Sequence, residues 1–219
     1  MEKLLNKNDI IMKEIFESGS FSQYGHLVNL NESRRITKSF AEEDGFTTKT
    51  KVFLSHKHDD LLELRDVIGF LQKEYYVQVY IDSKDSSMPE KTSGETASRI
   101  KQIIRKCDRF ILLATEGAIE SKWCNWELGY GDAQKYKDRI ALFPIKPKYS
   151  QDVNYKGNEY MQIYPYISYY DGSEKYRNGG RINKGYYVTT FDSNAVKTIE
   201  PLSHWFNKGN IYSEIDYII

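Results

Sequence analysis

Four short apolar runs, separated by stretches with helical periodicity, constrain the fold of this chain more than any other feature. The runs lie at residues 51–55, 77–81, 110–114 and 140–145. They are almost continuously apolar, which is typical of strands buried on both faces. Between the first two runs, apolar residues recur at spacings of three and four, at Leu61, Leu64, Ile68 and Leu71. This alternation predicts an α/β fold in which a parallel sheet carries helices on both faces.

The remaining core elements follow from the same reasoning. A long polar loop is expected from Asp82 to Ser93, followed by a helix with an apolar side. That side comprises Ile100, Ile103, Ile104 and Cys107. A further helix is predicted from about Lys122 to Tyr136. Within it, Gly129 and Gly131 are interpreted as small residues that permit close packing.

The region before the first strand is expected to be helical. Apolar residues recur at helical intervals from Glu2 to Glu17, and Gly19 is a plausible stop. Residues 31–48 are polar and are interpreted as a short helix or linker. We therefore predict an N-terminal helical extension at 1–48 and a domain at 49–219.

The C-terminal part is expected to elaborate on the core of 50–147 over residues 148–219. Residues 146–184 lose the strand and helix rhythm and predict an irregular excursion or short hairpin. Gly185–Thr190 predicts an edge strand and Ser193–Asn207 a final helix. The Tyr-rich segment at 149–190 is either a partner-binding surface or a local cap on the sheet edge.

Composition excludes several classes of function. Lys plus Arg and Asp plus Glu are equal at 31 each, so no global field favours nucleic acid or an anionic membrane as a partner. No stretch approaches the ~18 apolar residues of a membrane span, and the first residues do not have the pattern of a secretory signal. Cys107 and Cys124 are too few for a disulfide framework. We expect a cytoplasmic protein in a reducing compartment.

The polar loops that follow the strands locate the candidate site, because ligands of open parallel sheets bind at the carboxyl ends of the strands. On the helix after the third strand, Trp123, Glu127 and Tyr130 are spaced i, i+4 and i+7, which places a carboxylate between two aromatic residues. Carboxylates are rarely buried unless they are paired or used. The open alternative is that Glu127 lies at the edge of this face and pairs with a nearby lysine.

Four segments carry a family resemblance. In order and spacing, VFLSHKHDD, YIDSKDSSMPEKTSGE, RFILLAT and SKWCNWELG resemble the sequence boxes of TIR domains. The likeness covers residues 50–147 and extends to stand-alone bacterial TIR proteins of antiphage systems, such as the TIR component of Thoeris. It implies a flavodoxin-like fold.

The resemblance also implies an activity and its residues. In catalytic TIR domains, a glutamate in the helix after the third box is essential for cleavage of NAD+, and Glu127 matches it. Trp123 matches the tryptophan four residues earlier. Ser55 and His56 match the loop that lines the nucleotide site, and Asp82 begins the family's BB loop. NAD+ is then the substrate, with no cofactor and no metal.

By the same resemblance, the expected product is a cyclic ADP-ribose isomer that a separate effector reads. Hydrolysis to ADP-ribose remains open. Expected partners are further copies of the chain and a phage-derived activator. The rival functions are a TIR interaction module without catalysis and a nucleoside-processing enzyme of related fold.

Two other patterns are set aside on their chemistry. The sequence from His56 to Asp60 is similar to the H-x-H-x-D-H metal motif but lacks its last histidine. Cys124 lies between two tryptophans and is interpreted as a packed small side chain rather than a nucleophile.

Overall fold

A single sheet organises the protein, and its order shows where the parallel part ends. The computed structural model describes residues 15–33, 49–81, 94–135, 137–192, 196–207 and 216–218. Strands β2 (Lys51–Ser55), β3 (Gln78–Ile81), β4 (Arg109–Ala114) and β5 (Ile140–Lys146) pair in parallel, and the parallel part ends with the next strand, which also pairs with β5 in parallel. The sheet continues through β6 (Tyr166–Tyr170), β7 (Gly185–Phe191), β8 (Lys197–Pro201) and β9 (Asp216–Ile218). Along the sheet the order is β3-β2-β4-β5-β6-β7-β8-β9, and the pairs from β6 to β9 are antiparallel.

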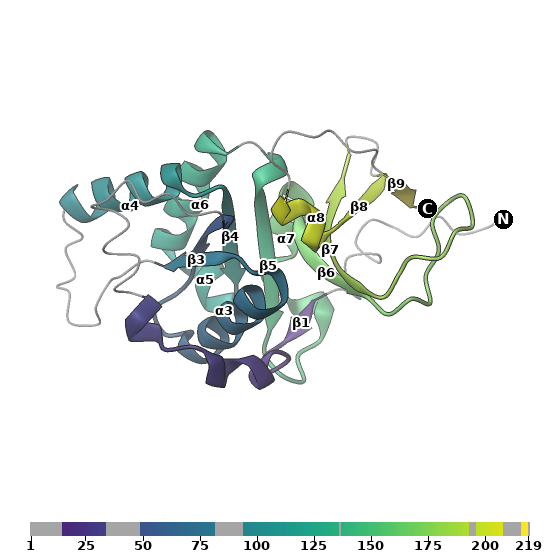
Figure 1. The fold of residues 1–219 in the computed structure, drawn as a ribbon, viewed down its shortest axis with the longest axis horizontal. Coiled ribbons are helices and arrows are strands. Elements are labelled where there is room, and N and C mark those ends of the chain that lie inside the picture. Colours follow the sequence, from purple (N-terminus) through teal and green to yellow (C-terminus); the bar gives the residue numbers. More distant parts are fainter. Residues whose placement is uncertain are drawn as a thin grey trace.

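Helices cover both faces of this sheet (Figure 1). One layer contains α4 (Gly94–Lys106), α5 (Glu116–Glu120), α6 (Lys122–Gln134) and α7 (Asn158–Ile163). The other contains η1 (Ser22–Leu27), α3 (Leu61–Tyr75) and α8 (Leu202–Asn207). Two short 3-10 turns flank β5, η2 (Lys137–Arg139) and η3 (Asp152–Asn154).

The buried strands divide their side chains between the two layers because successive residues point to opposite faces. On β2, Phe53 packs with the α4 and α6 layer, whereas Val52 and Leu54 pack with the α3 layer. All three side chains are fully buried. The predicted α/β sheet with helices on both faces is confirmed, as are the four predicted core strands.

The N-terminal segment differs from the prediction. Phe16–Glu17 form strand β1, which pairs in parallel with Ile145 and Lys146 of β5, so the predicted helix is wrong at these two residues. The remainder of that helix, residues 2–14, and residues 34–48 lie outside the described residues. The strand forms because it pairs with β5. Strand β6 pairs with β5 at Leu142, near the start of β5, and β1 pairs along the same strand near the end of β5.

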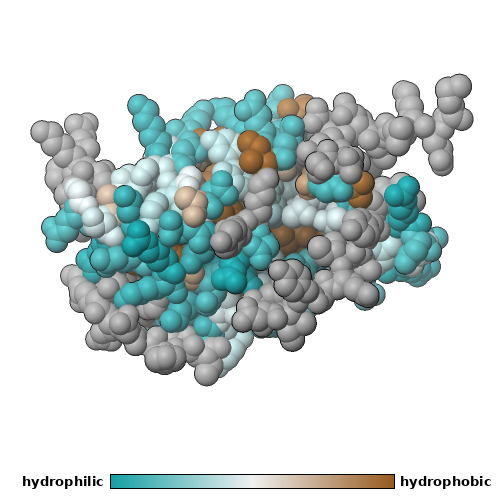
Figure 2. All heavy atoms as spheres, turned by 90° about the horizontal axis from the view of Figure 1, so that it is seen from above, coloured by the Kyte–Doolittle hydropathy of each residue, from teal (hydrophilic) through white to brown (hydrophobic). Residues whose placement is uncertain are grey.

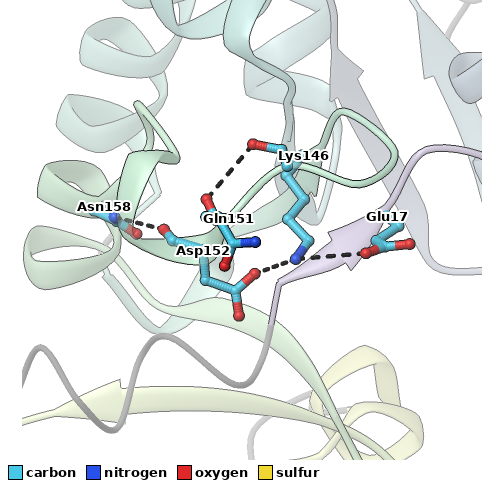
Figure 3. A network of polar contacts seen from close by, with 6 residues as sticks. Glu17, Lys146, Gln151, Asp152 and Asn158 are labelled. Carbon is cyan, nitrogen blue, oxygen red and sulfur yellow. Dashed lines mark hydrogen bonds and ion pairs between the residues drawn. The ribbon is translucent and has the colours of Figure 1, made fainter.

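Side chains hold β1 in this place. The Phe16 ring lies 5.3 Å from the ring of Phe143 on β5, centroid to centroid. Lys146 Nζ lies 3.6 Å from Glu17 Oε1 and donates a hydrogen bond to Asp152 (Figure 3). One lysine therefore joins β1, the end of β5 and the turn η3.

The C-terminal part is more ordered than the sequence predicts. Residues 146–184 contain α7 and β6, which the irregular interpretation missed, although the turn around Gly179 forms as predicted, with φ +86°. Strand β7 is not an edge strand, because it pairs with both β6 and β8. The predicted final helix, Ser193–Asn207, is wrong at 197–201, which form β8. Among the described residues of that range, Leu202–Asn207 are helical.

Surface properties follow from this packing. Of the Tyr-rich segment, Tyr155, Tyr166, Tyr170 and Tyr187 are buried, whereas Tyr149 is exposed, so both alternatives for this segment stay predictions. The face seen in Figure 2 is mostly hydrophilic, with hydrophobic residues in small separate areas. Of the helices that the structure describes, none has both the length and the apolar character needed to cross a bilayer.

Candidate active site

Ser55 and Glu127 meet at the carboxyl end of the parallel strands. Ser55 is the last residue of β2, and its side chain faces α6. Helix α6 begins after Ser121, whose hydroxyl caps it by accepting a hydrogen bond from the Cys124 amide at 3.3 Å. Glu127 then projects toward β2, and Ser55 Oγ donates a hydrogen bond to Glu127 Oε2 at 2.5 Å. The fold therefore joins two predicted site residues that are 72 positions apart in the sequence.

Burial decides between the two interpretations of Glu127. Both Glu127 and Ser55 have 0% of their surface exposed, so the alternative in which Glu127 solvates the edge of the helix is wrong. An ionised carboxylate without compensation inside a protein is costly by several kcal/mol. Short hydrogen bonds to an ionised acceptor are the stronger kind. The Ser55 hydroxyl supplies one hydrogen bond to the Glu127 carboxyl group.

The aromatic residues of α6 are arranged differently from the prediction. The rings of Trp123 and Trp126 pack at 4.6 Å, and those of Trp126 and Tyr130 stack at 6.2 Å. The Tyr130 hydroxyl accepts a hydrogen bond from Arg105 Nε of α4 at 2.6 Å. The three rings thus form a row toward α4, and Glu127 is held by β2 instead of between Trp123 and Tyr130.

Three further residues were predicted to belong to the site: His56, Trp123 and Asp82. His56 follows Ser55 and is buried, with its Nδ1 3.3 Å from the carbonyl oxygen of Leu54. Trp123 lies in the first turn of α6 and is partly buried. Asp82 lies outside the described residues.

The sequence analysis missed a contact between the loops after β2 and β4. Asp60 directly precedes α3, where a helix-capping role is the usual expectation, but its side chain makes no cap hydrogen bond. Its carboxylate instead accepts a hydrogen bond from the Thr115 hydroxyl. Burial raises the pKa of the Asp60 carboxyl, and the bond from Thr115 opposes that rise.

A cavity of about 230 Å³ adjoins this contact at the ends of β4 and β5. Its lining includes Asp60, Thr115, Gly117 and Lys146, together with Ser18 from the N-terminal segment. Across the described residues, no group of three or more His, Cys, Asp or Glu side chains is placed to hold a metal ion.

Both cysteines are free and buried. Burial raises the pKa of Cys124 to about 11, against the effect of its hydrogen bond with Ser121, and burial also raises the pKa of Cys107. At pH 7 a thiol with a pKa of about 11, as for Cys124, has roughly 300-fold less thiolate than an ordinary cysteine. This supports the interpretation of Cys124 as a packed side chain.

We therefore expect Ellman's reagent at neutral pH to react with neither thiol of the native protein and with both after denaturation. Burial and the low thiolate fraction both slow the reaction. Fast native labelling that peptide mapping assigns to Cys124 would contradict its packed position in α6.

Comparison with known proteins agrees with the fold. The family described as TIR domain matches residues 52–179, more than half of the chain. The chain therefore belongs to the TIR domain family, as the resemblance predicted. It is also similar to a protein of Bacillus cereus (strain MSX-D12) named probable 3' cyclic ADP-D-ribose synthase ThsB'. The two are 29% identical over 170 residues, which cover 75% of this chain and 83% of that protein.

Proposed function

We propose that this protein cleaves NAD+ at the bond between nicotinamide and ribose, with Glu127 as the carboxylate that acts beside the ribose. The observation that carries this proposal is the buried Glu127, which accepts the Ser55 hydrogen bond at the carboxyl edge of the sheet. The similarity to a probable cyclic ADP-ribose synthase supports the same conclusion.

The reaction suits a site with one carboxylate. When the glycosidic bond breaks, its electron pair moves to the ring nitrogen, and nicotinamide leaves as a neutral molecule without a general acid. Positive charge then develops on the ribose. A fixed anion in a site shielded from water stabilises that charge more in the transition state than in the ground state.

The second step determines the product. We propose that a nucleophile of the same molecule attacks the ribose cation and gives a cyclic ADP-ribose isomer. Attack by water gives ADP-ribose, and in both cases the nucleophile loses one proton, which Glu127 can accept. Ser55, His56, Asp82 and Trp123 are the proposed residues around the nucleotide. The reaction as written needs no cofactor and no metal.

The complete burial of Glu127 has a consequence for access. A carboxylate with no exposed surface meets a ribose only after the atoms that cover it move. We propose that assembly with further copies of the chain, or a phage-derived activator, causes this movement in the cytoplasm, and that a separate effector reads the product in antiphage defence.

The rival function is a TIR interaction module without catalysis, in which Glu127 needs no access to substrate. Mass spectrometry of NAD+ incubated with concentrated protein separates the two functions. The proposal expects nicotinamide together with a product lighter than ADP-ribose by one water. ADP-ribose itself would indicate a hydrolase. Unchanged NAD+ at every protein concentration, with and without phage lysate, would favour the interaction module.

A further inference from the structure

The sheet order reverses between β2 and β4. Strand β3 lies on one side of β2, and β4 and β5 lie on the other. The chain leaves β2 toward α3 on one face and leaves β4 toward α5 and α6 on the opposite face. Diverging loops open a crevice at such a point, and ligands of open α/β sheets bind there. In this protein that point lies between the ends of β2 and β4, and Ser55 is the last residue of β2.

Two contacts join the loops that flank this crevice. The first is the hydrogen bond from the Thr115 hydroxyl to Asp60. The second is the packing of Lys57 over Gly117, where a Cβ atom would lie 2.8 Å from Lys57 Cδ. Asp60 and Lys57 belong to the loop after β2, and Thr115 and Gly117 belong to the segment after β4. The two loops are therefore joined by two side-chain contacts.

Thr115 has a second partner that fixes the orientation of its hydroxyl. Its Oγ1 accepts a hydrogen bond from the Ala118 amide at 3.0 Å and so caps α5. With its acceptor side used in this way, the hydroxyl proton points to Asp60. Helix α5 leads directly to Ser121, which caps α6, the helix of Glu127. The contact thus connects the loop after Ser55 with the segment that places Glu127.

We propose that the Asp60–Thr115 hydrogen bond is a positioning contact that sets the width of this crevice, and hence the distance from bound NAD+ to Glu127. This inference rests on the proposed function. Neither residue takes part in bond making or breaking. Their effect passes through geometry, because a misplacement of about 1 Å between reacting groups can cost about 100-fold in rate.

Four variants separate the features of the contact. Asp60→Ala removes the bond and leaves the α5 cap intact, whereas Thr115→Val removes both. Thr115→Ser keeps the hydroxyl and serves as the conservative rescue. Asp60→Asn keeps an acceptor for the Thr115 hydroxyl but removes the charge. Burial raises the pKa of the Asp60 carboxyl, so Asp60→Asn, which keeps the hydrogen bond and removes the charge, is not expected to lower the melting temperature.

We expect Asp60→Ala and Thr115→Val each to lower kcat for NAD+ cleavage by about tenfold or more, with a smaller change in KM. The double variant should be no slower than the slower single variant, because both remove one interaction. Thr115→Ser and Asp60→Asn should stay within about threefold of the wild type. Thr190→Val is the matched control, since Thr190 shares a hydroxyl hydrogen bond with Thr198 between β7 and β8, away from this edge.

The outcomes distinguish this inference from the function on which it rests. If the wild type cleaves NAD+ and Asp60→Ala is as fast, the positioning contact is wrong and the proposed function stands. If Thr115→Ser is as slow as Thr115→Val, or if kcat falls only in step with the melting temperature, the contact is merely structural. If the wild type never cleaves NAD+, the proposed function fails, and both proposals are withdrawn.

Discussion

Replacement of Glu127 by glutamine is expected to lower nicotinamide release by roughly 10²–10³-fold, the scale of losing a main electrostatic contact in a transition state. The amide has nearly the shape of the carboxylate, and its oxygen still accepts the hydrogen bond that Ser55 donates. The variant therefore loses the charge and keeps the packing. Nicotinamide quantified by chromatography measures the rate, and circular dichroism measures the melting temperature.

A matched exchange on the neighbouring helix controls for the loss of a negative charge. Glu120 of α5 is largely exposed and pairs with Lys156, and an exposed pair of this kind contributes little to stability. Glu120→Gln should therefore cleave NAD+ at the wild-type rate. If the Glu127 variant does so as well, Glu127 has no part in the chemistry.

The site was partly predictable because some of its signals are local. The spacing of Trp123 and Glu127, together with the family resemblance, identified the carboxylate from one helix. Its partner is not local, because Ser55 lies 72 residues earlier. Asp60 and Thr115 are 55 residues apart, and an aspartate before a helix predicts a cap rather than a bond to another loop. Pairings of this kind depend on the order of the strands.

The fold, like the site, was predictable only where the signal is local in the sequence. Continuous apolar runs predicted β2, β3, β4 and β5 because strands buried on both faces have no polar side. Strand β8 has the sequence KTIEP, in which Ile199 is the one strongly apolar residue, and it directly precedes a true helix. Its pairing with β7 fixes it as a strand, and this pairing is not visible in local periodicity. Strand β1 is two residues long, too short for any periodic signal.

Gly69→Ala is expected to destabilise the protein by about 2–3 kcal/mol, the upper part of the usual range for overpacking. A Cβ atom on Gly69 would lie 2.3 Å from the backbone carbonyl oxygen of Tyr24. Backbone cannot rotate away as a side chain end can, so η1 must shift from α3. For a protein of this size the melting temperature should fall by roughly 4–12 °C, which thermal unfolding measures directly.

The same glycine-to-alanine change at Gly129 is expected to stabilise the protein. Gly129 lies within α6, and a Cβ atom there meets nothing within 4 Å, so the close packing predicted at Gly129 is wrong, whereas at Gly131 a Cβ atom would lie 2.9 Å from the Phe110 ring. Alanine is favoured over glycine in a helix by about 1 kcal/mol, so this variant should melt roughly 2–4 °C higher than the wild type. The same helix preference acts at Gly69, and a loss of stability there is therefore due to the contact with Tyr24. If Gly69→Ala also raised the melting temperature, η1 would not pack on α3 as described, and the N-terminal segment would not be part of this core.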